Sequence, residues 1–130
     1  MKFQKDGNML YTEERPWGRF TNLLENEHCK VKEIVVNPGQ RLSYQSHSKR
    51  EEKWTVVAGV ALVTLNEREI VLYPGDSVKI PKEAKHRVQN NGKEILKFIE
   101  IQTGEYFGED DIIRYSDDYG RSDANVRTEV

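Results

Sequence analysis

Three side chains that could bind a metal ion lie close together in the segment LSYQSHSKREEKW, residues 42–54. Gln45 and His47 are two positions apart, so in an extended strand they project from the same face. Glu52 follows where a short turn could fold it back beside them, and His86 begins a later strand-like segment. Imidazole nitrogen and carboxylate oxygen bind divalent first-row metals well, and a glutamine carbonyl oxygen adds a weaker ligand. The alternative is two ordinary histidines among surface polar groups.

The elements that would position these residues have the pattern of short β-strands. The segment CKVKEIVV, residues 29–36, is rich in β-branched residues and stops at the turn NPGQ. A longer apolar run, KWTVVAGVALVTL, is interrupted at Gly59, as a bend or tight turn would interrupt it. About eight short strands without a convincing amphipathic helix predict an all-β sandwich or barrel. The expected strands cover residues 29–36, 42–47, 53–65 with the break, 69–73, 76–81, 86–89 and 94–102.

Length and charge narrow the classes of partner. A chain of 130 residues is expected to form one domain with its own core. The net charge of −2 gives no electrostatic reason to expect nucleic acid or an anionic membrane as a partner. The N-terminus lacks an apolar signal-peptide region, and no apolar run is long enough to span a bilayer. The single Cys29 fits a reducing compartment, so a cytoplasmic location is expected.

Two spaced motifs resemble those of the cupin superfamily. The first contains Gly39, Gln45, His47, Glu52 and Gly59, and the second contains Gly75, Pro81, Glu83, His86 and Asn90. The chain departs from the cupin pattern at two of these positions. Gln45 stands where the first histidine is usual, and Glu83 replaces a turn glycine. The second replacement costs little if that turn needs no positive φ.

The glutamine points to one subfamily. Together with RPWG (15–18), GEYFGEDDIIR (104–114) and DDYGR (117–121), it resembles the type II mannose-6-phosphate isomerases. The resemblance implies a double-stranded β-helix, the cupin jelly-roll barrel. It implies one divalent metal ion held by Gln45, His47, Glu52 and His86; zinc is expected first, and manganese, iron, cobalt or nickel would also suit the ligands. It implies a single cupin domain over residues 1–130, with a core at about 15–121, an N-terminal arm at 1–14 and a frayed end at 122–130. The family also points to a homodimer, with the arm as a candidate exchanged segment.

The activity that the resemblance implies is the interconversion of mannose 6-phosphate and fructose 6-phosphate, with no nucleotidyl transfer. A base must move a proton between C2 and C1 of the sugar, and strand parity together with the resemblance makes Glu100 and Lys53 the candidates. The phosphate would be bound by Arg50, Arg114 and Arg121, with Arg15 behind them. For Arg114 and Arg121, salt bridges to the acidic tail are an equal alternative. The acidic run at 109–111 is interpreted as a helix N-cap or loop surface.

Two other classes of function remain open at this stage. One is a non-catalytic cupin that binds a sugar or sugar nucleotide and acts with a separate enzyme. The other is a metal-dependent oxygenase of the wider cupin class, which is disfavoured because Gln45 leaves two histidines in the expected ligand set. The enzyme and the binding protein differ in whether a general base is present.

Overall fold

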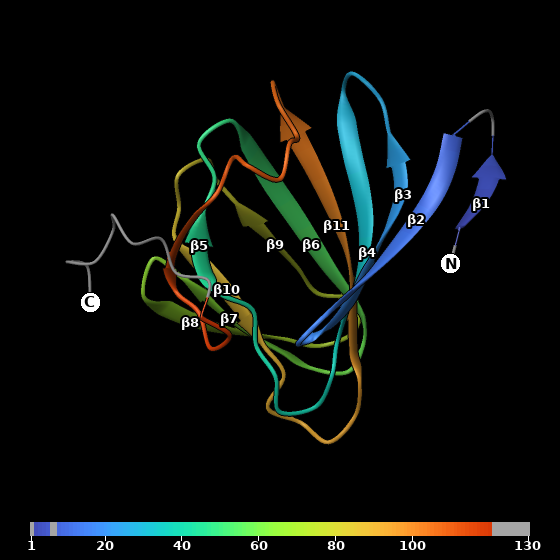
Figure 1. Ribbon diagram of the computed structural model, residues 1–130. Coiled ribbons are helices and arrows are strands. Elements are labelled where there is room, and N and C mark those ends of the chain that lie inside the picture. Colours follow the sequence, from blue (N-terminus) through green and yellow to red (C-terminus); the bar gives the residue numbers. More distant parts are fainter. Residues whose placement is uncertain (1, 6–7, 121–130) are drawn as a thin grey trace.

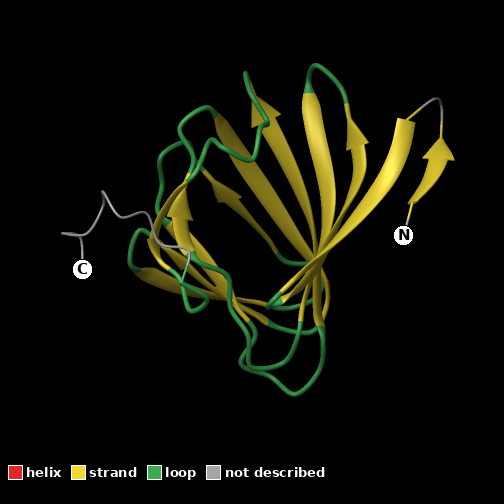
Figure 2. Cartoon of the chain, in the orientation of Figure 1, coloured by secondary structure: helices red, strands yellow, loops and turns green. Residues whose placement is uncertain are grey.

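The computed structural model describes residues 2–5 and 8–120, and this part of the chain is built from strands and loops (Figures 1 and 2). It contains no helix, and therefore none that could cross a membrane. The predicted all-β class is confirmed. The strands are β1 (Lys2–Lys5), β2 (Asn8–Arg15), β3 (Gly18–Glu25), β4 (Cys29–Val36), β5 (Tyr44–Ser46), β6 (Arg50–Ala58), β7 (Ala61–Leu65), β8 (Arg68–Leu72), β9 (Ser77–Ile80), β10 (His86–Gln89), β11 (Leu96–Gly104) and β12 (Ile113–Ser116).

The strands form two antiparallel sheets that curve toward each other (Figure 1). The larger sheet has the order β1-β2-β3-β4-β11-β6-β9, and the smaller one has the order β12-β5-β10-β7-β8. From β4 onward the chain repeatedly crosses from one sheet to the other, because β4, β6, β9 and β11 lie in the first and the strands between them in the second. This winding is that of a double-stranded β-helix, the fold expected from the resemblance.

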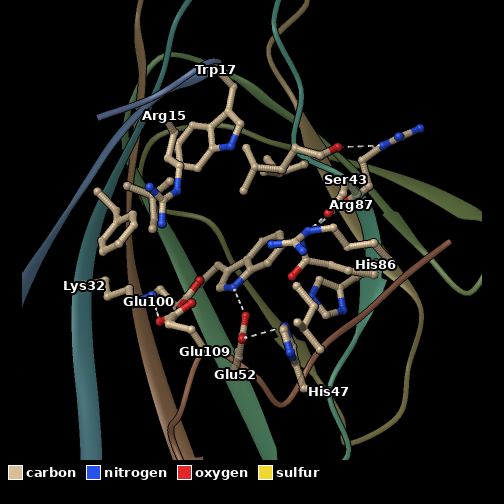
Figure 3. A pocket seen from close by; sticks show the side chains of 18 of the residues that line it. Arg15, Trp17, Lys32, Ser43, His47, Glu52, His86, Arg87, Glu100 and Glu109 are labelled. Atoms are coloured by element: carbon tan, nitrogen blue, oxygen red, sulfur yellow. Dashed lines mark hydrogen bonds and ion pairs between the residues drawn. The ribbon is translucent and has the colours of Figure 1, made fainter. Parts of the chain in front are cut away.

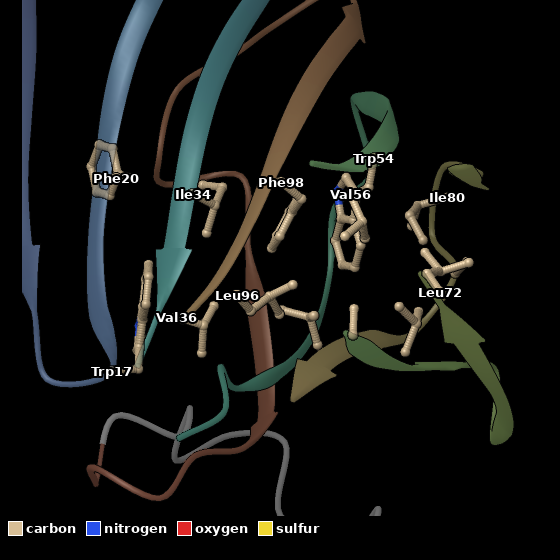
Figure 4. Packing of buried hydrophobic residues seen from close by; sticks show 14 residues of the cluster. Trp17, Phe20, Ile34, Val36, Trp54, Val56, Leu72, Ile80, Leu96 and Phe98 are labelled. Carbon is tan, nitrogen blue, oxygen red and sulfur yellow. The ribbon is translucent and has the colours of Figure 1, made fainter. Parts of the chain in front are cut away.

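The core lies between the sheets and follows the two-residue period of the strands. In β4, β6 and β11 every second side chain is buried, as expected for strands with one face against a core. Phe98, Leu96 and Val56 are among the residues with almost no exposed surface. Figure 4 shows these side chains between the sheets, with Trp17 and Phe20 at one end of the cluster and Ile80 and Leu72 at the other.

The inner face of the larger sheet changes from apolar to charged along its strands. Ile34, Phe98 and Val56 are direct neighbours across β4, β11 and β6. The next inward row along the same strands contains Lys32, Glu100 and Trp54, and the row after it contains Lys30, Gln102 and Glu52. One end of the barrel is therefore filled with hydrophobic side chains, and the other end carries buried charge.

Two turns show what the backbone requires. Gly59 has φ of 78°, and a Cβ there would lie 2.5 Å from the carbonyl oxygen of Ile95. The bend that interrupts the apolar run therefore needs glycine, as predicted. Glu83, where cupins usually have glycine, has φ of 68°. The turn therefore needs a positive φ at this position, and the replacement of glycine by glutamate is not the low-cost change that an ordinary φ would have allowed.

The N-terminal region contains more strand than expected. Within residues 1–14, expected to form an arm, β1 pairs with β2, and β2 pairs with β3. These strands extend the larger sheet on one side (Figure 1). β3 and β12 were also missing from the expected strands. β3 was missed because its sequence, GRFTNLLE, mixes glycine, asparagine and charge and has no strict alternation. The expected frayed end, residues 122–130, lies outside the described residues.

Candidate metal and substrate site

A pocket opens between the two sheets at the charged end of the barrel (Figure 3). Its empty volume, including space open to solvent, is about 690 Å³. Apolar and charged side chains both line it. The polar residues that line it are Arg15, Lys32, Ser43, Gln45, His47, Arg50, Glu52, His86, Arg87, Glu100, Glu109 and Arg114.

Three of the four predicted metal ligands form a compact buried group. His47, Glu52 and His86 each offer one ligand atom, and these atoms lie within 4.8 Å of one another. The residues come from the end of β5, from β6 and from the start of β10, so both sheets contribute. All three side chains are almost fully buried. Side chains that are separate in the sequence are thus brought together where the two sheets meet.

The two imidazole rings are oriented by backbone carbonyl groups. His47 Nδ1 lies 2.7 Å from the carbonyl oxygen of Asp111, and His86 Nδ1 lies 3.0 Å from that of Ala84. A carbonyl oxygen only accepts hydrogen bonds, so each Nδ1 carries the proton and each Nε2 is unprotonated. Metal-bound histidines in proteins are oriented by this kind of hydrogen bond.

The protonation states of the three residues suit a metal ion. Burial lowers the pKa of His47 to about 4 and also lowers that of His86, so both rings are neutral at pH 7. Burial alone would raise the pKa of Glu52, but the electrostatic interactions of its carboxylate with His47, His86 and Arg50 outweigh burial, and the pKa falls to about 2. A hydrogen bond of 2.8 Å from Trp54 Nε1 also stabilises this carboxylate. Two neutral imidazoles and one carboxylate are the forms that bind divalent ions.

The ligand atoms of His47 and Glu52 lie so close together that a positive charge is needed beside them. His47 Nε2 and Glu52 Oε2 lie 3.3 Å apart, and because His47 is neutral this contact brings a lone pair against a carboxylate. The buried Arg50 relieves it, with Nε 2.9 Å from Glu52 and Nη2 3.2 Å from His47 Nε2. Arg50 Nη1 is buried and has no hydrogen-bond partner. A divalent ion fits this donor set because it would supply the charge that the converging lone pairs need.

Gln45, the fourth predicted ligand, lines the same pocket. It lies directly opposite His86 in the pairing of β5 with β10. Its amide nitrogen donates a 2.7 Å hydrogen bond to Ser43 Oγ. This bond occupies the donor end of the side chain, so the carbonyl oxygen is the end that could bind a metal ion.

The two candidates for the general base have different positions. Glu100 is buried and lines the pocket, and it accepts a 2.6 Å hydrogen bond from Gln102 Nε2. Burial and the nearby Glu52 raise its pKa to about 7, while Lys32 and Arg50 oppose the increase. Lys53 is exposed on the other face of β6. The expectation that Lys53 faces the barrel is therefore wrong, because its neighbours Glu52 and Trp54 take the inward positions.

The predicted phosphate-binding arginines are partly placed. Arg15, Arg50 and Arg114 line the pocket, whereas Arg121 lies outside the described residues. Arg15 forms a 2.5 Å contact with Glu13 and lies over the Phe20 ring, with 5.2 Å from its guanidinium carbon to the ring centroid.

Lys30, Lys32 and Glu109 were not predicted as site residues. Both lysines are buried on the inner face of β4, and Glu109 reaches them from the loop after β11. The signal was present in CKVKEIVV, where the two lysines share the two-residue period of the inward-facing Ile34 and Val36.

The acidic run at 109–111 does not cap a helix, since the described residues contain none. Asp111 instead accepts hydrogen bonds from the backbone nitrogens of Ser48 and Lys49, at 3.0 and 2.9 Å. These contacts anchor the loop beside His47, whose ring binds the carbonyl oxygen of the same aspartate. The three residues do lie in a loop, as interpreted, but Asp111 binds the backbone of a neighbouring loop and Glu109 lines the pocket.

A double-stranded β-helix with a His–Glu–His group at its open end defines a cupin. Residues 4–117 match the family described as "Mannose-6-phosphate isomerase C-terminal". The chain belongs to this family, as the resemblance indicated.

The relatives are similar along most of this chain but are much longer. Mannose-1-phosphate guanylyltransferase of Salmonella montevideo is 44% identical over 108 residues, which are 83% of this chain and 23% of that protein. Alginate biosynthesis protein AlgA of Pseudomonas syringae pv. tomato is 46% identical over 119 residues, 89% of this chain and 25% of that protein. The chain thus spans about a quarter of the length of these relatives.

Solved structures agree with the fold. A protein of Acidithiobacillus ferrooxidans with the provisional designation of sugar phosphate isomerase has 29% identity and a TM-score of 0.55, over 58% of this chain and 50% of that chain. A double-stranded β-helix protein of Klebsiella pneumoniae has 23% identity and a TM-score of 0.64, over 72% of this chain and 75% of the other. At this identity, the second match bears on the fold alone.

Proposed function

We propose that this chain is a metal-dependent aldose–ketose isomerase that interconverts mannose 6-phosphate and fructose 6-phosphate. The observation that carries the proposal is the presence, in one pocket, of a His–Glu–His group and a separate buried carboxyl group, Glu100. A binding protein would need the first, whereas a second, buried carboxyl group with a raised pKa is typical of general acid–base catalysis. The family and the relatives named above support the choice of substrate.

The metal ion would be held by His47, Glu52 and His86, with Gln45 as the fourth ligand and zinc as the first choice. When bound, it supplies a Lewis acid that polarises the oxygens of the substrate at C1 and C2. Burial holds the two imidazoles neutral, and their hydrogen bonds to the carbonyl oxygens of Asp111 and Ala84 orient the rings. The hydrogen bond from Trp54 Nε1 helps to keep the Glu52 carboxylate charged.

Glu100 is the proposed general base. Its ionised carboxylate takes the proton from C2 of the aldose, and the resulting carboxylic acid returns the proton to C1, so the group ends the cycle as it began. A pKa of about 7 suits both directions, because the two forms are equally populated near neutral pH. The hydrogen bond from Gln102 to Oε2 fixes the orientation of the carboxyl group.

The guanylyltransferase activity in the names of several relatives is not assigned to this chain. Those names describe proteins of which this chain covers about a quarter. The described residues form an all-β domain and contain no strand–helix unit that could hold a nucleotide phosphate at a helix N-terminus.

A coupled assay of mannose 6-phosphate conversion to fructose 6-phosphate tests the proposal. Purified protein is stripped of metal and reloaded in turn with zinc, manganese, iron, cobalt or nickel. We expect turnover that depends on the ion and that is lost in Glu100→Gln. Binding of mannose 6-phosphate without turnover, with every one of these ions loaded, would contradict the isomerase and favour a sugar-binding cupin.

A further inference from the structure

Two buried lysines lie side by side on the inner face of β4. The side chains of Lys30 and Lys32 are 7% and 6% exposed, although lysine is rarely buried without a partner. Lys32 lines the pocket and lies 4.3 Å from the centroid of the Phe20 ring. The catalytic residues proposed above do not need these two charges, which suggests that they have another role.

The partner of both lysines is a single carboxylate from a loop. Glu109 Oε2 lies 2.7 Å from Lys32 Nζ and 3.3 Å from Lys30 Nζ. Lys30 is also 3.4 Å from the carbonyl oxygen of Phe107, and its distance to Glu25 is 3.9 Å. One carboxylate oxygen thus lies between two ammonium groups, as an oxygen of a phosphate group would.

The two sides of this contact differ in how easily they can separate. The lysines are fixed on a strand with hydrogen-bonded neighbours on both sides, and their ammonium groups are out of water. The Glu109 side chain is 56% exposed and belongs to the loop between β11 and β12, so it has room to turn into solvent. The lysines, in contrast, cannot lose an anionic partner without a large desolvation penalty.

We propose that Lys30 and Lys32 form the subsite for the phosphate group of the substrate, and that Glu109 occupies this subsite until the phosphate displaces it. The inference rests on the proposed function, because it assigns the dianionic end of the same sugar phosphate. The strands explain the geometry: β4 is separated from β6, which carries Glu52, by one strand, or about 10 Å at the backbone. Figure 3 shows Lys32 and Glu109 on one side of the pocket and the two histidines on the other.

Arg15, Arg50 and Arg87, which also line the pocket, fit this role less well. Arg50 is bound to Glu52 and His47, at the end where the metal and the sugar oxygens would be. Arg15 is paired with Glu13. Arg87 donates from Nε to the carbonyl oxygen of Leu42 at 2.9 Å. Lys32 therefore combines burial, a position in the lining of the pocket and a partly exposed partner, and Lys30 lies beside it on the same face of β4.

Calorimetric titration of the metal-loaded protein with inorganic phosphate and with mannose 6-phosphate tests the subsite. Glu109→Gln removes the competing charge, and we expect phosphate to bind about three- to tenfold more tightly. Lys32→Met keeps the length of the side chain and removes its charge, and we expect about ten- to hundredfold weaker binding. Glu33→Gln is the matched control. Glu33 is on β4 next to Lys32, carries the same charge as Glu109, and pairs with Lys97 on the outer face of the sheet.

Unchanged phosphate affinity in both Glu109→Gln and Lys32→Met would overturn the subsite, and so would an equal gain in Glu33→Gln. If Lys32→Met does not fold, Glu109→Gln decides alone, since Glu109 lies in a loop outside the sheet. The inference and the isomerase proposal can fail separately. If the unmodified protein turns over mannose 6-phosphate but the variants bind phosphate as it does, the subsite is rejected. If the variants bind phosphate differently but the unmodified protein shows no turnover, the isomerase is rejected.

Discussion

Lys32 and Glu100 lie directly opposite each other on β4 and β11, yet the ammonium group of Lys32 is 2.7 Å from a different carboxylate, that of Glu109. Lys32 thus forms an ion pair with the loop residue Glu109, although the strand register places it beside Glu100. Glu100 keeps a pKa of about 7 as a result of its burial and of repulsion by Glu52, with only partial compensation from Lys32. The relationship links the proposed base to the proposed phosphate subsite.

Replacement of Glu100 tests the proposed base. Loss of a general base typically costs on the order of 10²- to 10⁴-fold in rate, so we expect Glu100→Gln to lose turnover to this extent while the metal content is unchanged. In the unmodified protein the rate should rise as the pH increases through about 7, because the ionised carboxylate is the active form. Lys53→Met is the control, since the exposed Lys53 faces away from the pocket. A greater loss in Lys53→Met than in Glu100→Gln would contradict the assignment.

The same carboxyl group makes a prediction about stability. Its pKa in the folded protein is about 7 and its ordinary value is 4.5. Between these pH values the folded state holds more protons than the unfolded state, so this group lowers the free energy of unfolding as the pH rises. We expect Glu100→Gln to gain stability relative to the unmodified protein between pH 4.5 and 7, as measured by urea unfolding of the metal-free protein. A difference that stays constant across this range would show that Glu100 titrates normally.

Metal analysis tests the ligands. Purified protein should contain close to one divalent ion per chain, and His47→Ala and His86→Ala should each empty the site, because each removes one of three converging donors. The third histidine offers a matched control: the side chain of His28 is 82% exposed, and His28→Ala should keep the ion. Full occupancy in both pocket variants would refute the site.

The turn at Glu83 predicts a stabilising substitution. A non-glycine residue with φ of 68° carries backbone strain that glycine would relieve. Part of this gain in stability is lost because glycine has a greater backbone entropy in the unfolded chain. We expect Glu83→Gly to increase the free energy of unfolding by about 0.5–1 kcal/mol. Lys82→Gly, at the exposed neighbouring position with ordinary φ, should instead decrease it by about 0.5–1 kcal/mol. Equal effects at the two positions would argue against strain in the turn.

Association through sheet edges is the remaining prediction. β1 is at the outer edge of the larger sheet, and an open edge presents unpaired backbone groups to a second chain. We propose a homodimer that covers this edge, and light scattering at micromolar concentration should give twice the mass of the 15.2 kDa chain. Removal of residues 1–7 should then shift the equilibrium toward the monomer. A monomeric mass for the complete chain would speak against the proposal.

Local patterns in the sequence were sufficient for much of the fold, and the spaced motifs that resemble those of cupins indicated the candidate metal ligands. Strands show a period of two, and turns need glycine or proline, so β4, β6, β11 and the bend at Gly59 were predictable. The spacing of His47, Glu52 and His86 also pointed to one site, because these residues stand at strand ends that a barrel brings together. β3 was missed because its apolar and polar residues do not alternate.

Only the tertiary structure decided how charge is shared inside the pocket. The same two-residue period allowed Lys53 or its neighbours to face inward, and packing of Trp54 in the core settled the choice. Glu109 reaches Lys32 across 77 positions of the chain, and no local pattern specifies which loop covers which strand. The pKa of Glu100 depends on that arrangement, because burial and neighbouring charges act through space. The sequence by itself determined which residues share a face of each strand. The packing of distant segments determined which face is buried and what its residues can do.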